Sequence, residues 1–155
     1  MVASAVIVTD LKGKVLISRN YRGDIPMNSS EKFSQRIQNL DECDIKPVFT
    51  ENGVTYASVK QNNVYILALT KRNVNITLTL LYLYRICDVF KEYFGDITEE
   101  SIRDNFVIIY ELMDEMMDFG YPQTTEHKIL KEFLNKSQLL VLESTTYPGT
   151  TEEIL

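Results

Sequence analysis

Three strand-type segments separated by two short turns lie between residues 45 and 70. Each is rich in the β-branched and aromatic residues that favour strands: residues 45–50, 54–60 and 64–70. The turns are Asn52-Gly53, which is a strong hairpin signal, and Asn62-Asn63. Because turns of two residues join antiparallel neighbours, the sequence predicts a three-stranded meander. Pro47 lacks an amide proton, which places the first of these segments at a sheet edge.

A second block of strands opens the chain. Residues 2–9 are rich in Val, Ile and Ala, and a strand pattern resumes at Val15 and runs to about Tyr21. Between them, Gly13 can adopt the positive φ that a tight turn requires. The two blocks must share one sheet to bury their faces. We therefore expect an α/β domain of the α+β type, with a five-stranded, mostly antiparallel sheet packed by helices.

The expected order of elements is β-β-α-β-β-β-α-α-α. In the first helix, Ser29 or Ser30 offers a cap, because a serine hydroxyl can accept a hydrogen bond from a free amide of the first turn. Phe33, Ile37 and Leu40 then repeat at helical spacing. This helix is predicted to be amphipathic.

The second helix is predicted to begin after Asn73 or Asn75 and to end at Gly95. Its apolar residues are numerous, so we expect it to be largely buried. They are Ile76, Leu80, Leu83, Tyr84, Val89, Phe90 and Phe94.

Two further helices follow in the prediction. The first is long, capped by Thr98 and ending at Gly120, with Pro122 beyond it. Its apolar stripe is Ile102, Phe106, Ile109, Tyr110, Met113, Met116 and Met117. The second is short and capped by Thr125. Its apolar residues are Ile129, Leu130 and Phe133.

Charge and cysteine content restrict the environment. The net charge of −6 and the pI near 4.8 argue against nucleic acid as a partner and disfavour an anionic membrane surface. No apolar run is long enough to span a bilayer, and no signal peptide is evident. We therefore expect a reducing compartment, in which Cys43 and Cys87 are buried thiols.

The residues that most often perform chemistry are sparse. His127 is the one histidine, and no nucleophile or second ligand accompanies it. Cys43, Cys87 and His127 lack the spacing of a zinc site, and Lys12-Gly13-Lys14 lacks the remaining residues of a phosphate loop. We expect no catalytic residue, no cofactor and no metal, and hence no enzyme.

Carboxylates on the long helix have two interpretations. Glu111, Asp114, Glu115 and Asp118 could hold a cation or transfer protons, but an acidic face opposite an apolar stripe is more often a solvated surface. A basic partner surface is a third possibility. The methionines of the same helix are predicted to pack in the core instead of forming a binding groove.

A long block of residues resembles a known family. The stretch Glu99-Glu100-Ser101-Ile102-Arg103-Asp104-Asn105-Phe106-Val107-Ile108-Ile109-Tyr110-Glu111-Leu112 runs on to Phe119-Gly120-Tyr121-Pro122-Gln123-Thr124. It is similar to the medium (mu) chain of heterotetrameric clathrin adaptors of the Golgi/endosome type. The N-terminal residues Asp10-Leu11-Lys12-Gly13-Lys14 and Arg19-Asn20-Tyr21-Arg22-Gly23-Asp24 match the same family. The resemblance covers residues 1–135.

The resemblance implies a fold and a role. The fold is longin/SNARE-like, a five-stranded antiparallel sheet with helices on both faces. The role is that of a structural subunit domain, which docks on a large β-type adaptin, joins the other adaptor chains and meets the clathrin coat indirectly. It places the protein in the cytoplasm, on Golgi and endosomal membranes and clathrin-coated vesicles, held there through the complex.

Four residues in the block are candidates for the partner interface. These residues lie near helix ends: Arg103, Asp104, Tyr121 and Pro122. Helix capping, a structural ion pair and a turn explain their presence there as well as a partner contact does. In the family, cargo is read by a separate C-terminal β-rich domain, so no cargo-binding residue is assigned here.

The last residues depart from the family. We expect residues 1–136 to form the longin-like domain and residues 137–155 to form a different tail, whose resemblance reflects a fusion, an artefact or a chance match. The tail resembles a strand–turn–helix segment of nucleotide-sugar dehydrogenases, with Pro148-Gly149 as its turn. Two alternatives to the adaptor role stay open. The fold is also that of a longin-type trafficking regulator, and the tail allows a fragment of such a dehydrogenase.

Overall fold

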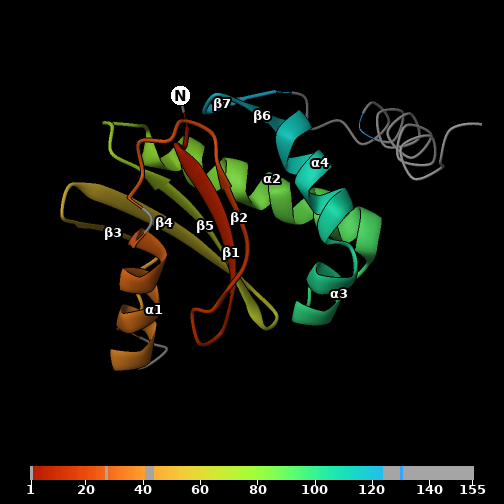
Figure 1. Cartoon of the computed structure of the whole chain (residues 1–155), viewed down its shortest axis with the longest axis horizontal. Coiled ribbons are helices and arrows are strands. Elements are labelled where there is room, and N and C mark those ends of the chain that lie inside the picture. Colours follow the sequence, from red (N-terminus) through yellow and green to blue (C-terminus); the bar gives the residue numbers. More distant parts are fainter. Residues whose placement is uncertain (1, 27, 41–43, 124–129, 131–155) are drawn as a thin grey trace, which may run out of the picture.

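The computed structural model describes residues 2–26, 28–40, 44–123 and 130 of the 155-residue chain. At its centre lies a five-stranded sheet with the strand order β2-β1-β5-β4-β3 (Figure 1). The strands are β1 Ala5–Asp10, β2 Val15–Asn20, β3 Val48–Glu51, β4 Val54–Gln61 and β5 Val64–Thr70. The predicted sheet is confirmed, and each of its four pairings is antiparallel.

The meander forms at the predicted turns. Asn52 and Gly53 have φ values of 50° and 76°, the left-handed conformation that suits a two-residue hairpin, and Asn62 has a φ of 47°. β3 is an edge strand as predicted, but it begins at Val48 and not at residue 45. Pro47 precedes the strand, and its carbonyl accepts a hydrogen bond from the Ser58 amide at 2.7 Å.

β5 is the central strand, and all seven of its residues are buried. β1 lies beside it, although more than fifty residues separate the two strands in the chain. The register pairs Val8 with Ile66 on one side and with Ile17 on the other. A bulge follows, because Thr9 pairs with Val15, so one extra residue of β2 lies between these pairs.

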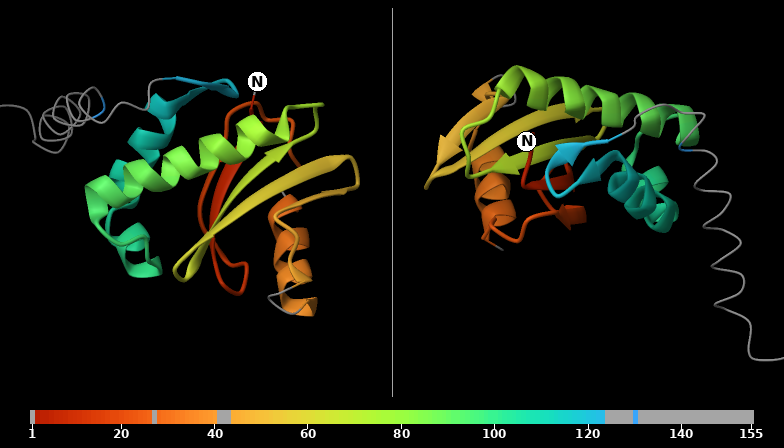
Figure 2. Two further views of the ribbon diagram at one scale, coloured as in Figure 1. Left: turned by 180° about the vertical axis from the view of Figure 1, so that it is seen from behind. Right: turned by 90° about the horizontal axis from the view of Figure 1, so that it is seen from above.

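Helices cover both faces of the sheet, as the family resemblance implied (Figure 2). Helix α1, Ser29–Asn39, packs on one face through Phe33 and Ile37, both buried. Helix α2, Ile76–Phe94, crosses the other face. Two apolar clusters result, one on each side of the sheet. Buried apolar side chains of this kind contribute about 1.5–3 kcal/mol each to folding.

The predicted cap of α1 is wrong. Asn28 occupies the N-cap position and its side chain makes no capping hydrogen bond, while Ser29 is the first helical residue and is buried. Leu40 lies at the C-cap, so it ends the apolar side instead of extending it. Burial of Phe33 and Ile37, and not a cap, therefore holds this helix in place.

Helix α2 begins and ends as predicted but is less buried. The Asn75 side chain accepts hydrogen bonds from the amides of Thr77 and Leu78, and Gly95 ends the helix with a φ of 76°. Tyr84, expected to be buried, is 52% exposed. Leu78 and Leu81 are also exposed. One side of α2 packs on the sheet and the other faces solvent.

The predicted long helix is two helices, α3 Glu99–Asp104 and α4 Phe106–Met116. They separate at Asn105, whose side-chain amide and backbone amide both donate to the Ser101 carbonyl. Phe106, predicted to be in the apolar stripe, is 53% exposed. The buried residues of α4 are Ile109, Leu112, Met113 and Met116.

Met116 ends α4, four residues before the predicted stop. A small hairpin follows, formed by β6 Met117–Asp118 and β7 Tyr121–Pro122. Phe119 and Gly120 make its turn, with φ values of 46° and 87°. The Gly120 carbonyl accepts a hydrogen bond from the Val2 amide at 2.8 Å. The helix predicted from Thr125 lies outside the described residues, except Leu130, which is buried.

Candidate docking surfaces

The four residues predicted to contact a partner lie on two separate surfaces. Arg103 and Asp104 end α3, whereas Tyr121 and Pro122 form β7. All four are exposed. Helix α4 lies between the two pairs, so they occupy opposite ends of that helix (Figure 1). The structure therefore does not bring them into one patch.

Interactions within the chain give three of these four residues a structural role. The Arg103 guanidinium pairs with Glu99 one helical turn earlier, which is the ion pair that the sequence allowed. Tyr121 and Pro122 belong to the hairpin that the sequence allowed as a turn. An exposed ion pair of this kind contributes only about 0.3–0.5 kcal/mol to the helix. Whether the four residues contact a partner stays a prediction.

Helix α4 is fastened to the sheet by side chains that reach from β2 and the residue after it. Arg19 donates two hydrogen bonds to the Asp114 carboxylate. The Tyr21 hydroxyl donates to the Met113 carbonyl at 2.8 Å, and burial raises the pKa of that hydroxyl well above its usual value. These contacts hold α4 against β2.

The β6–β7 hairpin is held by Arg22. Its guanidinium lies 4.8 Å from the centre of the Phe119 ring, and one of its nitrogens donates to the Phe119 carbonyl at 3.4 Å. The same side chain pairs with Asp24 at 3.5 Å. The position of the hairpin therefore depends on the segment that follows β2.

Exposed apolar side chains form surfaces that sequence reasoning missed. Leu78, Leu81 and Tyr84 are about half exposed and follow one another at three-residue spacing along α2. Phe106 and Val107 are 53% and 47% exposed at the start of α4. A signal was present in the sequence, because α2 has apolar residues around more of its circumference than one sheet face can cover. Large exposed apolar side chains that cluster mark interaction surfaces.

The acidic residues of α4 do not form a cation site. Asp114 is occupied by Arg19, and Asp118 lies beyond the helix, in β6. Across the described ranges, no group of three or more histidine, cysteine, aspartate or glutamate side chains is placed to hold a metal ion. The methionine interpretation is confirmed, because Met113, Met116 and Met117 are all buried.

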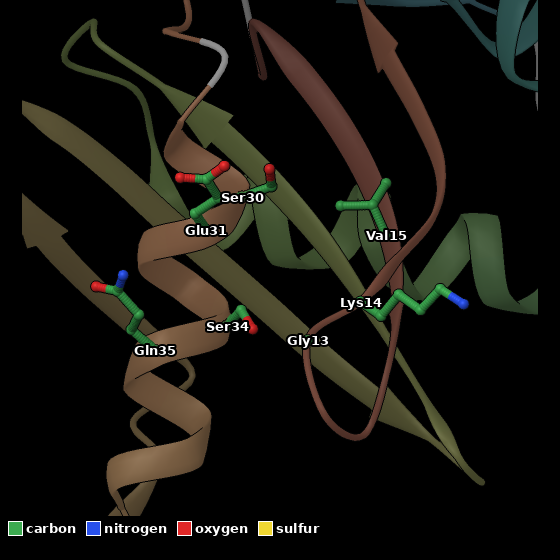
Figure 3. Close-up of a pocket in the computed structure, with 7 residues that line it drawn as sticks. All are labelled: Gly13, Lys14, Val15, Ser30, Glu31, Ser34 and Gln35. Carbon is green, nitrogen blue, oxygen red and sulfur yellow. The ribbon is translucent and has the colours of Figure 1, made fainter.

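Residues of the β1–β2 turn and of α1 line a surface groove of about 490 Å³ (Figure 3). Ser34 on α1 and Gly13 in the turn lie in close contact beside it. The Ser34 hydroxyl donates to the Lys12 carbonyl at 3.0 Å, and Gln38 donates to the same oxygen. The ammonium group of Lys14 points away from α1 (Figure 3). These groups fasten the turn to the helix, and the arrangement resembles a packing contact more than a reaction site.

Cys87 is buried, as predicted, and burial raises the pKa of its thiol to about 11. It is therefore protonated at neutral pH and unsuited to nucleophilic attack. Cys43 and His127 lie outside the described residues. Among the helices that the structure describes, none combines the length and apolarity needed to cross a membrane.

Comparison with known proteins identifies relatives along most of the chain. The chain is 57% identical over 136 residues to "AP-1 complex subunit mu" of Dictyostelium discoideum, which covers 88% of this chain and 32% of that protein. It is 48% identical over 137 residues to "AP-1 complex subunit mu-2" of Homo sapiens, with the same coverage. Against "AP-1 complex subunit mu-1" of Arabidopsis thaliana, identity is 46% over 148 residues, 94% of this chain and 34% of that protein. The chain thus spans about a third of the length of these relatives.

Solved structures support the fold. A chain of a "homology model of the full-length AP-3 complex in a stretched open conformation" superimposes with a TM-score of 0.68 at 10% identity. The match covers 92% of this chain and 96% of that one. At this identity the likeness shows the fold alone. The family model described as "Clathrin adaptor complex small chain" matches residues 2–140. The predicted resemblance to clathrin adaptor chains is confirmed, and the chain belongs to the clathrin adaptor complex small chain family.

Proposed function

We propose that this protein is a structural subunit domain of a clathrin adaptor complex, acting in vesicle-mediated protein transport between Golgi and endosomes. The observation that supports it most is the identity of 46–57% to AP-1 mu subunits over at least 136 residues. The family match over residues 2–140 includes both apolar clusters and the exposed surfaces of α2 and α4. A domain that conducts no reaction would act through such surfaces.

The proposed partner is a large β-type adaptin, with the other adaptor chains and, indirectly, the clathrin coat. The exposed apolar side chains on α2 and α4 support a protein partner, because apolar area removed from water contributes about 25 cal/mol per Å² to association. The net charge of −6 supports attachment to membranes through the complex instead of by direct contact. It also weighs against nucleic acid. The proposed location is the cytoplasmic face of Golgi and endosomal membranes.

Co-expression with the trunk of a β-type adaptin from the same organism tests the proposal. The two chains are expected to elute together in size-exclusion chromatography, at equal molar amounts. A full-length homologous mu chain serves as the positive control, and an unrelated helical-repeat protein of similar charge as the negative control. Separate elution of this chain, together with complex formation by the full-length control, would contradict the proposal.

Two alternatives make different predictions. A longin-type trafficking regulator has the same fold, but the identity to mu subunits supports the adaptor role over it. A dehydrogenase fragment, inferred from residues 137–155, predicts saturable binding of a nucleotide sugar or a nicotinamide cofactor. We propose that the chain is not an enzyme, and isothermal titration calorimetry should detect no heat with either ligand.

A further inference from the structure

β3 is the open edge of the sheet. It ends the strand order, and β4 is the one strand that pairs with it in the described part of the chain. At the opposite edge, the Tyr110 hydroxyl of α4 donates to the Ser18 carbonyl of β2 at 3.4 Å, and Arg19 attaches the same helix. Helix α4 therefore lies beside β2, whereas β3 borders the far side of the sheet (Figure 1).

The register of the β3–β4 hairpin shows which backbone groups of β3 face outward. Glu51 directly precedes the two-residue turn, a position whose amide and carbonyl bond to the partner strand. Pro47, four residues earlier, has the same orientation, because its carbonyl accepts from the Ser58 amide at 2.7 Å. Bonded and unbonded positions alternate along an antiparallel strand. The amides and carbonyls of Val48 and Thr50 therefore point away from β4.

A groove of about 330 Å³ lies beside this edge, between β3 and α1. The residues that line it are Lys32, Gln35, Arg36, Asn39, Leu40 and Glu51. Lys32 and Arg36 are four residues apart, so they lie on one side of α1. Phe49 and Glu51 alternate with the outward-bonding positions, and Phe49 packs on the sheet face that α1 covers. A strand added to β3 would place every second side chain over this groove.

The groove has an excess of positive charge, in a chain whose net charge is −6. Lys32 and Arg36 make no ion pair in the part of the chain that the structure describes, and Glu51 is the one carboxylate of the lining. The Cζ atom of Arg36 lies 4.2 Å from the centre of the Phe49 ring. The Nε atom of Arg36 is buried and donates to no described group. The guanidinium is thus held beside the groove with unused capacity for a carboxylate.

We propose that β3 and this groove bind an extended acidic segment of a partner protein, which adds an antiparallel strand to the open edge. Its backbone would pair with Val48 and Thr50, and Asp or Glu at alternate positions would lie against Lys32 and Arg36. Nucleic acids and phospholipids are also anionic, but they lack the backbone amides that continue a sheet. The inference goes beyond the proposed function, because the isolated domain contains the whole site.

Protection of the sheet edge explains only part of this arrangement. Short edge strands and prolines are common defences against unwanted strand pairing, and β3 has four residues and follows Pro47. Such a defence requires no cations beside the strand. The unpaired charges of Lys32 and Arg36 therefore favour a specific acidic occupant over a merely protected edge.

Fluorescence polarisation of labelled peptides, titrated with the full chain, tests the inference. The probe alternates Glu with Val and Thr over roughly ten residues, which is long enough to span β3. A control peptide has Lys in place of each Glu. It is expected to bind at least about tenfold more weakly than the probe, because the groove repels its charge.

N-methylation of the probe tests the strand pairing separately from the charge. In an antiparallel added strand, the residues opposite Val48 and Thr50 turn their amides towards β3 and their side chains away from the groove. These are the Val and Thr positions of the probe, because its Glu side chains occupy the groove. N-methylation at the Val and Thr positions is therefore expected to weaken binding at least about tenfold. N-methylation at the Glu positions is the matched control and should change binding little.

Variants of the chain test the same contacts from the other side. Lys32→Glu is expected to weaken binding of the probe at least about tenfold. Lys14→Glu makes the same change in net charge on the other side of α1, and it should leave binding unchanged. Thr50→Pro removes an outward amide, at an edge position where proline is tolerated, and should also weaken binding. Circular dichroism must show that each variant is folded.

The outcomes decide the inference without the adaptin experiment. It is overturned if the folded chain does not bind the probe, if Lys32→Glu binds it as well as the unchanged chain, or if the two N-methylated probes bind equally. Sedimentation velocity of the chain alone tests a different occupant of the edge. A dimer that Thr50→Pro abolishes would show that a second copy covers β3, and it would likewise overturn the inference. None of these results depends on binding to a β-type adaptin, so the two proposals can fail separately.

Discussion

The guanidinium of Arg19 in β2 and the carboxylate of Asp114 in α4 form a two-pronged ion pair, with Nη2 and Oδ2 2.7 Å apart. Ninety-five residues separate the two partners in the chain. The pair therefore links the first hairpin to the last described helix. Parallel hydrogen bonds of this kind fix orientation as well as distance.

Removing this ion pair should loosen α4 but leave the domain folded. Both side chains are nearly half exposed, so the pair should contribute no more than about 1 kcal/mol to the free energy of unfolding. A double-mutant cycle with Arg19→Ala and Asp114→Ala, followed by urea denaturation, measures the coupling. The same cycle on Arg85 and Asp88, which are 64% exposed and 3.9 Å apart, is the control. Equal coupling in the two cycles would contradict the prediction.

Gly13→Ala should destabilise the domain strongly. The residue has a φ of +81°, and a Cβ atom there would lie 2.4 Å from the Cα of Ser34. The backbone conformation costs about 1–2 kcal/mol, and the clash with α1 adds about 1–3 kcal/mol. Gly23 also has a positive φ, of +72°, but a Cβ atom there would meet no atom within 4 Å. Gly23→Ala should therefore lose only the roughly 1–2 kcal/mol that the backbone conformation costs. Urea denaturation of both variants measures the difference, and equal losses would show that Ser34 is not in contact.

Cys87 should react slowly with thiol reagents while the domain is folded. Its pKa of about 11, against 9.0 for an unperturbed thiol, leaves roughly one hundredth of the usual thiolate at pH 8. Ellman's reagent, applied to a Cys43→Ser variant, should therefore react at least about 100 times faster in urea. Because folding raises this pKa, stability is retained below pH 9 and declines as the pH rises towards 11. Fast labelling of the folded protein would contradict the described burial.

Thr98→Ala should weaken the start of α3. The Thr98 hydroxyl accepts from the Ser101 amide at 3.2 Å, and the Ser101 hydroxyl accepts from the Thr98 amide at 2.8 Å. Loss of such a cap costs about 0.5–2 kcal/mol. Thr77→Ala, on the exposed first turn of α2, should change stability by less than about 0.5 kcal/mol. Thermal unfolding of both variants measures the two losses of stability. Equal losses would show that Thr98 does not cap α3.

Turn and capping residues made much of the sheet, and the bounds of α2, predictable from the sequence. Asn52-Gly53 determines a hairpin within two residues, and Asn75 and Gly95 set both ends of α2. The break at Asn105 was not predictable, because the apolar spacing continues through it from Ile102 to Phe106. The backbone of Asn105, with φ −116° and ψ 23°, leaves the helical conformation, and the spacing contains no sign of this.

Candidate docking residues were harder to predict than the fold. Tyr84 and Phe106 were assigned to the core because an apolar side chain in a helix is usually buried within its own chain. A subunit violates that expectation where it is completed by another chain. Under the proposed function, the group that covers such a residue would belong to the partner, and the sequence of one chain does not record it.

The position of β1 beside β5 has a consequence for the order of events during synthesis. The first strand emerges from the ribosome with only β2 as a neighbour, and its other side stays open until Val64–Thr70 has been made. At about 5–20 residues per second, this takes several seconds. An open edge of Val and Ile can pair with other chains during that time. The nascent domain should therefore depend on chaperones more than a fold in which neighbouring strands follow one another in the chain.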